Sequence, residues 1–168
     1  MLLSALSDPR IYRFIPQEPP VSLVRLIERY AKLENRSSED GAQAWLNWVI
    51  KQENTCLGRI EASVQLESKT SSIAYLLSPD YWGQGFALEA VRALLNHLEQ
   101  QGIIEVSAWV DSRNLASLKL LERLGFVQHE FLPAADHFKG EVSDEWVYRL
   151  NLPGSSASQT FTLERPLS

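Results

Sequence analysis

The sequence predicts one α/β domain of the α+β type, built around a single central sheet with helices packed against it. Three observations support this fold class. Apolar runs of strand length alternate with stretches of helical periodicity along the chain. At two places an apolar run leads through a short turn into a helical stretch, and strand pairs flank this central part. The length of 168 residues suits one domain, and no repeat or low-complexity tract divides it.

The boundaries of the predicted elements follow from turn residues and from the period of the apolar positions. Asp8 and Pro9 end the first helix, because the residue before a proline avoids helical geometry. Residues 44–51 alternate between two faces, and a turn at Glu53 and Asn54 leads to a partner strand. In chain order, the predicted elements are helices over 1–7 and 21–33, strands over 44–51, 56–66 and 73–77, a helix over 87–98, a strand over 103–110, a helix over 115–124, and strands over 126–132 and 142–150.

The most informative stretch joins the strand over 73–77 to the helix that follows it. The connection carries Gly83 and Gly85 directly before the first helical turn. The first N–H groups of a helix have no partner within it, the helix dipole adds positive charge there, and glycine lets ligand oxygens approach closely. This arrangement predicts an anion site suited to a pyrophosphate, while the alternative is a tight turn whose glycines serve only chain geometry. Neither a Walker loop nor the dinucleotide-binding glycine pattern is present.

A second strand-to-helix junction lies further along the chain. Asn114 is a favourable N-cap, and Gly125 is placed where a helix ends. Between them, Leu118, Leu121 and Leu124 form one apolar stripe. The pattern predicts a helix that is buried along one side.

The two junctions together resemble the GNAT N-acetyltransferases, and within them the RimJ/RimL-like branch, which acetylates protein N-termini and small amines. The matching motifs are residues 82–87 and the block from Asn114 and Ser117 to Gly125 and Phe126. The resemblance implies a mixed, mostly antiparallel sheet, with acetyl-CoA as cosubstrate and no metal. It implies that the pyrophosphate, pantetheine arm and thiol end of acetyl-CoA are bound by Leu76, Leu77, Trp82, Gly83, Gln84, Gly85, Phe86, Ala87, Asn114 and Ser117.

The resemblance also implies direct attack of the amine on the thioester in a ternary complex, with main-chain amides near Leu77 polarising the carbonyl. Many members place an acidic tyrosine seven residues after the motif asparagine, where this chain has Leu121. Ser117 is therefore the candidate proton donor, and the alternative is a serine that serves only the helix cap. Glu61 is the candidate base, with a solvent-facing strand residue as the alternative.

Two functions remain open from the sequence. One is an N-acetyltransferase whose acceptor is a primary amine of a protein N-terminus or a small molecule. The other is a non-catalytic acyl-CoA-binding module of the same fold, since the usual acid and base are missing. Asp136 and His137, expected in a loop, would border the site or simply be solvated.

Composition narrows the partners and the compartment. The net charge of −5 argues against a nucleic-acid partner and weakly favours cationic amines. A single cysteine, Cys56, fits a reducing compartment, and no apolar run approaches the length of a membrane helix. The cytoplasm, without a membrane partner, is the expected location.

The end of the chain needs a separate interpretation. Residues 1–150 form the predicted acetyltransferase domain, 151–158 are linker-like, and 159–168 alternate apolar and polar side chains. The RimJ/RimL-like chains usually open with such a strand, which is missing at this N-terminus. One hypothesis is a circular permutation, in which the tail adds an edge strand to its own subunit or is swapped into a homodimer partner. The alternative is a disordered tail.

Overall fold

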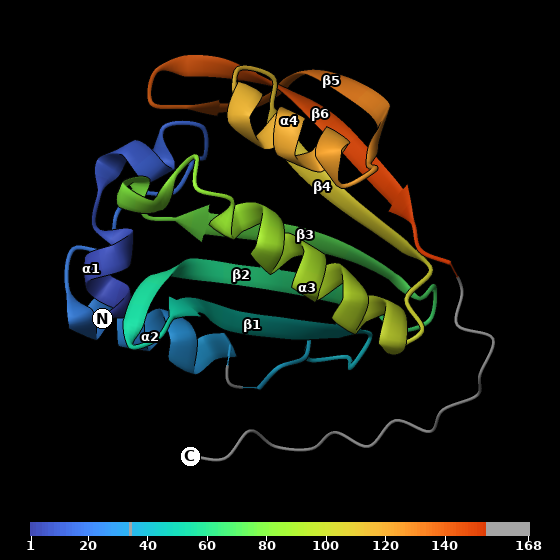
Figure 1. The fold of residues 1–168 in the computed structure, drawn as a ribbon, viewed down its shortest axis with the longest axis horizontal. Coiled ribbons are helices and arrows are strands. Elements are labelled where there is room, and N and C mark those ends of the chain that lie inside the picture. Colours follow the sequence, from blue (N-terminus) through green and yellow to red (C-terminus); the bar gives the residue numbers. More distant parts are fainter. Residues whose placement is uncertain (34, 154–168) are drawn as a thin grey trace.

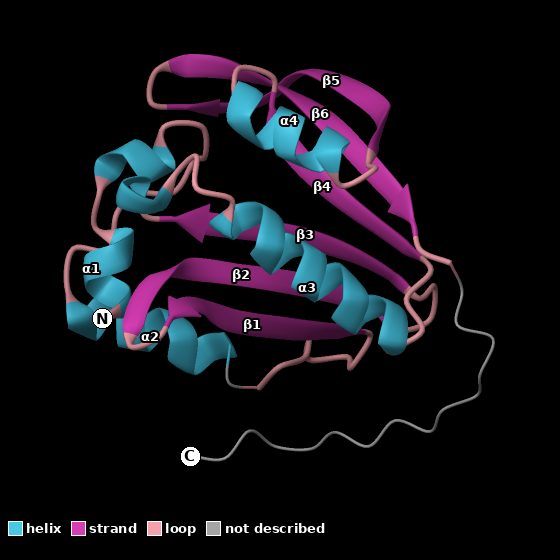
Figure 2. Ribbon diagram, in the orientation of Figure 1, coloured by secondary structure: helices cyan, strands magenta, loops and turns pink. Residues whose placement is uncertain are grey.

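A six-stranded sheet in the order β1-β2-β3-β4-β6-β5 forms the centre of the molecule, as Figure 1 shows for the computed structural model. The structure describes residues 1–33 and 35–153. Its elements are α1 (Leu2–Leu6), the 3-10 turn η1 (Pro9–Tyr12), α2 (Leu23–Leu33), β1 (Gln43–Gln52), β2 (Thr55–Gln65), β3 (Thr70–Leu77), the 3-10 turn η2 (Pro79–Tyr81), α3 (Phe86–Gln100), β4 (Glu105–Asp111), α4 (Leu115–Arg123), β5 (Val127–Phe138) and β6 (Glu141–Asn151). Each predicted helix and strand is present, and the predicted fold class is confirmed (Figure 2).

The sheet is mixed because one of its neighbouring pairs is parallel. Strands β1, β2 and β3 pair antiparallel, as do β4, β6 and β5, and β3–β4 is the one parallel pair among the described strands. The connection from β3 to β4 contains α3, which is the usual way to join parallel neighbours. Helix α3 lies over β2 and β3, and α4 lies over β4 and β6 (Figure 1).

The parallel pair is short, and the two strands then separate. Only Thr70–Ser72 of β3 pair with Glu105–Ser107 of β4. Beyond these residues the main chains of β3 and β4 diverge (Figure 1), and this divergence of the two backbones is called the wedge. Residues 73–77 of β3 keep β2 along one edge and have no strand along the other. Alternate main-chain N–H and C=O groups of this segment therefore face the wedge.

The strand register assigns the side chains of the central strands to two faces. Ile60 pairs with Tyr75, and Ala62 with Ile73, on the side that packs against α3 and forms the main core. Arg59 and Glu61 project to the opposite side, where Arg59 shares a cavity with residues of α1 and α2. These sides are named the α3 face and the α2 face.

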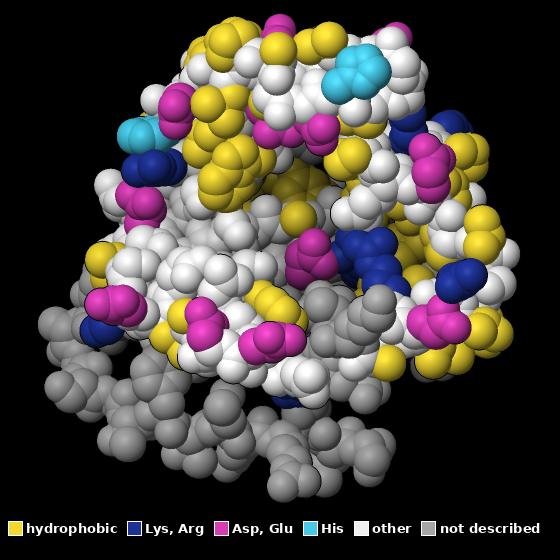
Figure 3. Space-filling view, turned by 180° about the vertical axis from the view of Figure 1, so that it is seen from behind, with side chains coloured by type: hydrophobic (Ala, Val, Ile, Leu, Met, Phe, Trp, Pro, Cys, Tyr) yellow, Lys and Arg dark blue, Asp and Glu magenta, His cyan; other side chains and the backbone are white. Residues whose placement is uncertain are grey.

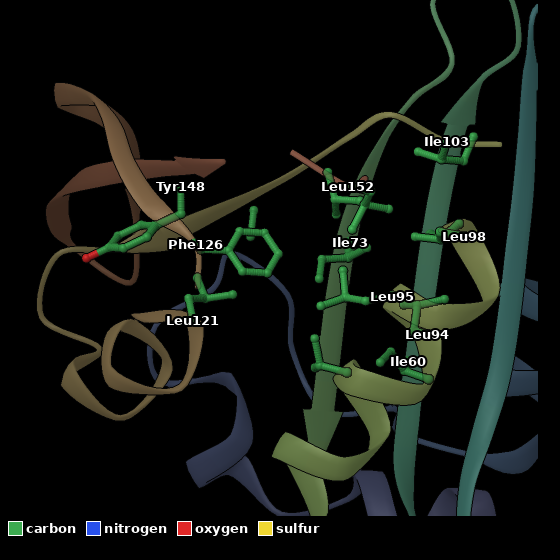
Figure 4. Packing of buried hydrophobic residues seen from close by; sticks show 14 of the residues in the cluster. Ile60, Ile73, Leu94, Leu95, Leu98, Ile103, Leu121, Phe126, Tyr148 and Leu152 are labelled. Atoms are coloured by element: carbon green, nitrogen blue, oxygen red, sulfur yellow. The ribbon is translucent and has the colours of Figure 1, made fainter. Parts of the chain in front are cut away.

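The core has contributions from both helices of the α3 face. Leu94, Leu95 and Leu98 of α3 lie against β2 and β3, while Leu121 of α4 lies beside Phe126 and Tyr148 (Figure 4). Leu98, Leu121 and Tyr148 have no exposed surface. The predicted apolar stripe of α4 is thus confirmed in its most buried member.

Strand β5 is longer than the sequence predicted. The loop expected after residue 132 is part of a hairpin that turns at Lys139 and Gly140, so Asp136 and His137 lie in a strand and not in a loop. A bulge between Leu132 and Asp136 interrupts the alternation on which the prediction depended. Pro133 is tolerated there because β5 is an edge strand.

The proposed tail strand over residues 159–168 lies outside the described residues. The same holds for most of the linker, since the described part of the chain ends at residue 153. The circular permutation and the swapped strand therefore stay predictions.

Candidate cofactor and acceptor site

The turn between β3 and α3 presents a row of free main-chain N–H groups. Gly85 is the N-cap of α3 with φ of +90°, and no side chain caps this helix end. Gly83 also has a positive φ of +71°. Within the described residues, the N–H groups of residues 83–88 have no hydrogen-bond acceptor. These groups and the positive end of the helix dipole lie where the sequence predicts the anion site, which is called the cradle below.

The backbone conformation, and not crowding, requires glycine at both positions of this turn. A Cβ added to Gly83 or Gly85 would meet no atom within 4 Å. The positive φ angles are nevertheless costly for any other residue. The open space around both positions leaves room for the oxygens of a ligand.

Side-chain hydrogen bonds fix the turn against the end of β3. The Trp82 indole N–H donates to the Leu77 carbonyl at 2.8 Å, and the Gln84 side-chain amide donates to the Asp80 carbonyl at 2.8 Å. The structure therefore brings residues 82–87 next to Leu76 and Leu77, as the sequence predicted. The Leu77 carbonyl is already taken by Trp82, which leaves the other main-chain groups of this segment for a pantetheine arm.

Gly58 allows the end of β3 to lie unusually close to β2. It pairs with Leu77, and a Cβ at this position would lie 2.1 Å from the Leu76 carbonyl oxygen and 2.9 Å from the Leu77 Cα. No side chain fits there without movement of the β3 backbone. The sequence analysis missed this residue, although a glycine within a predicted strand is a signal of close backbone approach.

The second junction is built around a buried carboxylate. Asp111, with 1 % of its side chain exposed, accepts from the Arg113 main-chain N–H at 2.8 Å, from the Arg113 guanidinium at 2.7 Å and 3.0 Å, and from the Ser143 hydroxyl at 2.8 Å. Burial raises the pKa of Asp111, but these hydrogen bonds outweigh it and hold the pKa below its ordinary value. The Asp111 carbonyl also accepts from the Asn114 N–H at 2.9 Å. Asp111 therefore shapes the turn that starts α4, a role that the sequence analysis did not assign.

Asn114 is the N-cap of α4, as predicted. Its side-chain oxygen accepts from the Ser117 main-chain N–H at 3.2 Å. This bond uses the main chain of Ser117 and leaves its hydroxyl free to act elsewhere. The cap and a chemical role for the hydroxyl are thus compatible, although the sequence analysis treated them as alternatives.

A buried hydroxyl without a partner lies on the α3 face beside the wedge. The Tyr75 hydroxyl is inaccessible to solvent and has no hydrogen-bond partner among the described residues. Burial raises the pKa of Tyr75, and the nearby Ser117 hydroxyl opposes this increase in part. Buried polar groups are almost always paired, so this phenol is available to the Ser117 hydroxyl, a water or a polar ligand. The sequence analysis assigned no role to Tyr75.

Glu61 lies on the α2 face, in an ion pair. The Arg59 Nη1 donates to the Glu61 Oε2, while Oε1 has no partner in the described part of the chain. The Glu61 side chain is 29 % exposed and lines a hollow of about 320 Å³ together with Trp45 and Asn47. Figure 3 shows this side of the molecule, where a hollow lies next to adjoining basic and acidic side chains. Glu61 is thus a cleft residue rather than a freely solvated one.

The two groups of candidate residues lie on opposite sides of the sheet. The cradle, Ser117 and Tyr75 lie on the α3 face, and Glu61 lies on the α2 face. At the wedge, β3 and β4 form no strand-to-strand hydrogen bonds, so no continuous sheet separates the α3 face from the α2 face there. Within residues 1–33 and 35–153, no cluster of His, Cys, Asp and Glu could hold a metal ion, and no helix is long and apolar enough to cross a membrane.

Comparisons with known proteins agree with this geometry. The family model described as the acetyltransferase (GNAT) domain matches residues 1–127. An uncharacterized N-acetyltransferase, p20 of Bacillus licheniformis, is 25% identical over 146 residues, which cover 86% of this chain and 82% of that protein. The L-2,4-diaminobutyric acid acetyltransferase of Vibrio cholerae is 26% identical over 167 residues, which cover 88% and 93% of the two chains.

A solved structure shares the fold at lower identity. The spermidine N-acetyltransferase of Vibrio cholerae, in complex with CoA and spermine, superposes with a TM-score of 0.75. The two chains are 19% identical, and the match covers 89% of this chain and 86% of that one. At this identity the similarity establishes the shared architecture.

Proposed function

The chain belongs to the GNAT acetyltransferase family, whose members are enzymes that acetylate amines, and we propose that it moves the acetyl group of acetyl-CoA to a primary amine. The amine attacks the thioester directly in a ternary complex, without an acyl-enzyme. Cys56, the cysteine that a covalent mechanism would need, is buried in β2.

One observation carries this proposal. The unpartnered N–H groups of residues 83–88 lie at the end of the same strand whose edge is open along residues 73–77. The first set suits the pyrophosphate of acetyl-CoA, and the second suits the amide groups of an extended pantetheine arm. The bound cosubstrate supplies an activated acetyl group as a thioester.

The remaining steps are assigned to side chains on the two faces. Main-chain N–H groups at the open edge of β3 stabilise the developing oxyanion. The Ser117 hydroxyl, with Tyr75 next to it, delivers a proton to the departing thiolate. The Tyr75 phenol is protonated at neutral pH, because its ordinary pKa of about 10 lies well above 7 and burial raises the pKa further. Glu61 receives the proton of the attacking amine through its unpartnered oxygen.

The proposed acceptor is a small-molecule amine or a protein N-terminus. The diaminobutyric acid acetyltransferase, a relative along nearly the whole chain, supports the first choice. An α-amine, with a pKa of about 8 against about 10.4 for a lysine side chain, would need less help from a base. We further assign the chain to the RimJ/RimL-like branch, on the motif at residues 82–87, and to the cytoplasm, on the buried free thiol.

A non-catalytic acyl-CoA-binding module is the second candidate function. The observation that favours it is Leu121, which is fully buried at the position where many relatives carry an acidic tyrosine. A module would bind CoA but release no thiol from acetyl-CoA with any acceptor.

The deciding experiment combines calorimetry with CoA and a thiol-release assay over a panel of amines. We expect heat with CoA, and acceptor-dependent thiol release. Gly85→Ala should weaken CoA binding at least tenfold, because it strains and reshapes the cradle. Gly102→Ala is the matched control, since Gly102 also has a positive φ with open space around it but lies after α3. Equal loss of affinity in both variants, or no heat with the unchanged protein, would refute the cradle.

A further inference from the structure

A cavity on the α2 face has an unusual charge. It has a volume of about 240 Å³ and lies between α1, the link before α2, α2 itself and β2. Arg25, Arg29 and Arg59 line it, against one acidic side chain, Glu18. The whole chain carries a net charge of −5. The cavity therefore has the opposite sign to the molecule, and it favours an anion.

The ion pairs around this cavity leave donors unused. Arg25 pairs with Glu28 at 3.1 Å on the exposed side of α2, and Arg59 pairs with Glu61 while only 7 % of its side chain is exposed. Arg29 has no carboxylate partner among the described residues. Since each guanidinium carries five N–H donors, both Arg29 and Arg59 keep the capacity to bind a further anionic group.

Two of these guanidinium groups converge on one neutral oxygen. The Gln17 side-chain oxygen lies 3.0 Å from Arg29 Nη2 and 3.5 Å from Arg59 Nη2. A carboxylate carries a negative charge and two acceptor oxygens, so it can form the paired N–H···O bonds to a guanidinium that a single amide oxygen cannot form. The position of the Gln17 oxygen thus marks where the carboxylate of a ligand would bind.

The arginine cluster lies close to the proposed reaction centre. Arg59 pairs across β2 and β3 with Leu76, and Glu61 pairs with Ala74, both in the segment of β3 that borders the wedge. Side chains at paired positions share a face, with Cβ atoms about 4.5–5.5 Å apart. An anion bound by Arg59 would therefore leave an amine a few bonds away within reach of the wedge and of Glu61.

We infer that the acceptor of this enzyme carries a carboxylate a few bonds from the amine that is acetylated, as an amino acid does. Arg29 and Arg59 bind the carboxylate and Glu61 faces the amine. This inference rests on the proposed acetyltransferase function and narrows its acceptor from amines in general to zwitterionic ones. It also narrows the expectation from net charge, which weakly favoured cationic amines.

The test compares amino acids with their decarboxylated counterparts. L-ornithine with putrescine, and L-lysine with cadaverine, differ only in the carboxylate. We expect kcat/KM to be at least tenfold higher for the amino acid of each pair. Arg29→Gln should lower kcat/KM about tenfold for the amino acids and leave it unchanged for the diamines, since one charge-assisted contact is lost. Arg92→Gln, an equal charge change on the exposed side of α3, is the control and should change neither.

Two outcomes would overturn the inference, and they differ from a failure of the proposed function. A preference for the diamines, or an equal effect of Arg29→Gln on both classes, removes the carboxylate site. Calorimetry adds a measurement that needs no turnover. L-ornithine should release heat when it binds to the CoA-loaded protein, and this binding heat should be absent in Arg29→Gln. Heat with CoA but none with L-ornithine or L-lysine rejects the carboxylate site alone. No heat with CoA rejects the acetyltransferase proposal and the inference with it.

Discussion

Gly58→Ala tests whether the exact path of β3 matters for the reaction. In the structure, the new Cβ would lie 2.1 Å from the Leu76 carbonyl oxygen, whereas ordinary contacts begin at 3.4 Å. The end of β3 must therefore move by about 1.3 Å, because the obstructing atom belongs to the main chain and not to a flexible side chain. This movement occurs at the residues proposed to border the thioester.

Gly58→Ala should change both the stability of the fold and the rate of catalysis. Overpacking of a well-packed site costs about 1–3 kcal/mol. For a chain of this length, each kcal/mol corresponds to a change in Tm of about 2–4 °C, so we expect Tm to fall by about 2–12 °C. A displacement of about 1 Å at a reaction centre costs on the order of 100-fold in turnover, so kcat should fall far more than the folded fraction.

Thermal unfolding and the thiol-release assay, run well below Tm, separate these two parts. Gly140→Ala is the matched control, since it strains a positive φ in the β5–β6 turn without crowding any atom. A Gly58→Ala protein that is less stable but turns over normally would show that the path of β3 is irrelevant to the chemistry. An unchanged Tm would show that the close contact itself is wrong.

Three further predictions concern the site. Tyr75→Phe should lower kcat about 100-fold and leave CoA affinity nearly unchanged, because a proton donor typically contributes at least that factor to the rate. Ser117→Ala should have the same effect. Normal turnover in either variant excludes its hydroxyl as the proton donor. Asp111→Asn should lower Tm most at neutral pH. The pKa of Asp111 is lower in the folded chain than in the unfolded chain, where it is about 3.9. The charged carboxylate therefore stabilises the fold above that unfolded-state pKa, and this stability is lost as the pH falls through the folded-state pKa. The difference in Tm between Asp111→Asn and the unchanged protein should therefore shrink in acid, and a constant difference down to pH 3 would contradict this reasoning. Glu61→Gln, assayed with an acceptor that reacts through an α-amine, should reduce kcat/KM strongly at pH 7 and little at pH 10, where an amine with a pKa of about 8 is already neutral; an equal loss at both pH values would assign Glu61 to binding and not to proton transfer.

The sequence predicted the features that depend on local geometry. Within the described residues, turn residues and periodicity predicted each α-helix and strand, apart from the first three residues of β3 and the second half of β5. Gly83 and Gly85 suggested the cradle because a residue without a Cβ allows close approach of a ligand, and both have a positive φ in the structure. Features that depend on long-range contacts were missed. Tyr75 is an aromatic strand residue, which is usually part of a core. The lack of a hydrogen-bond partner for its hydroxyl among the described residues depends on how β3 and β4 separate. The extension of β5 depends on a bulge that no periodicity signals.

The separation of β3 from β4 connects these observations. A closed parallel ladder beyond Ser72 would pair the wedge-facing N–H and C=O groups of residues 73–77 and would be the more stable arrangement for the sheet alone. It would also isolate the cradle, on the α3 face, from Arg59 and Glu61 on the α2 face. The unpaired edge of β3 is thus unfavourable for the free chain. It becomes favourable when a ligand lies between the α3 face and the α2 face and its amide groups pair with the main chain of β3. Stabilisation by CoA should accordingly exceed that by a molecule that binds the cradle alone, such as pyrophosphate. Equal gains in Tm with both ligands at the same concentration would mean that the open edge of β3 contributes nothing to binding.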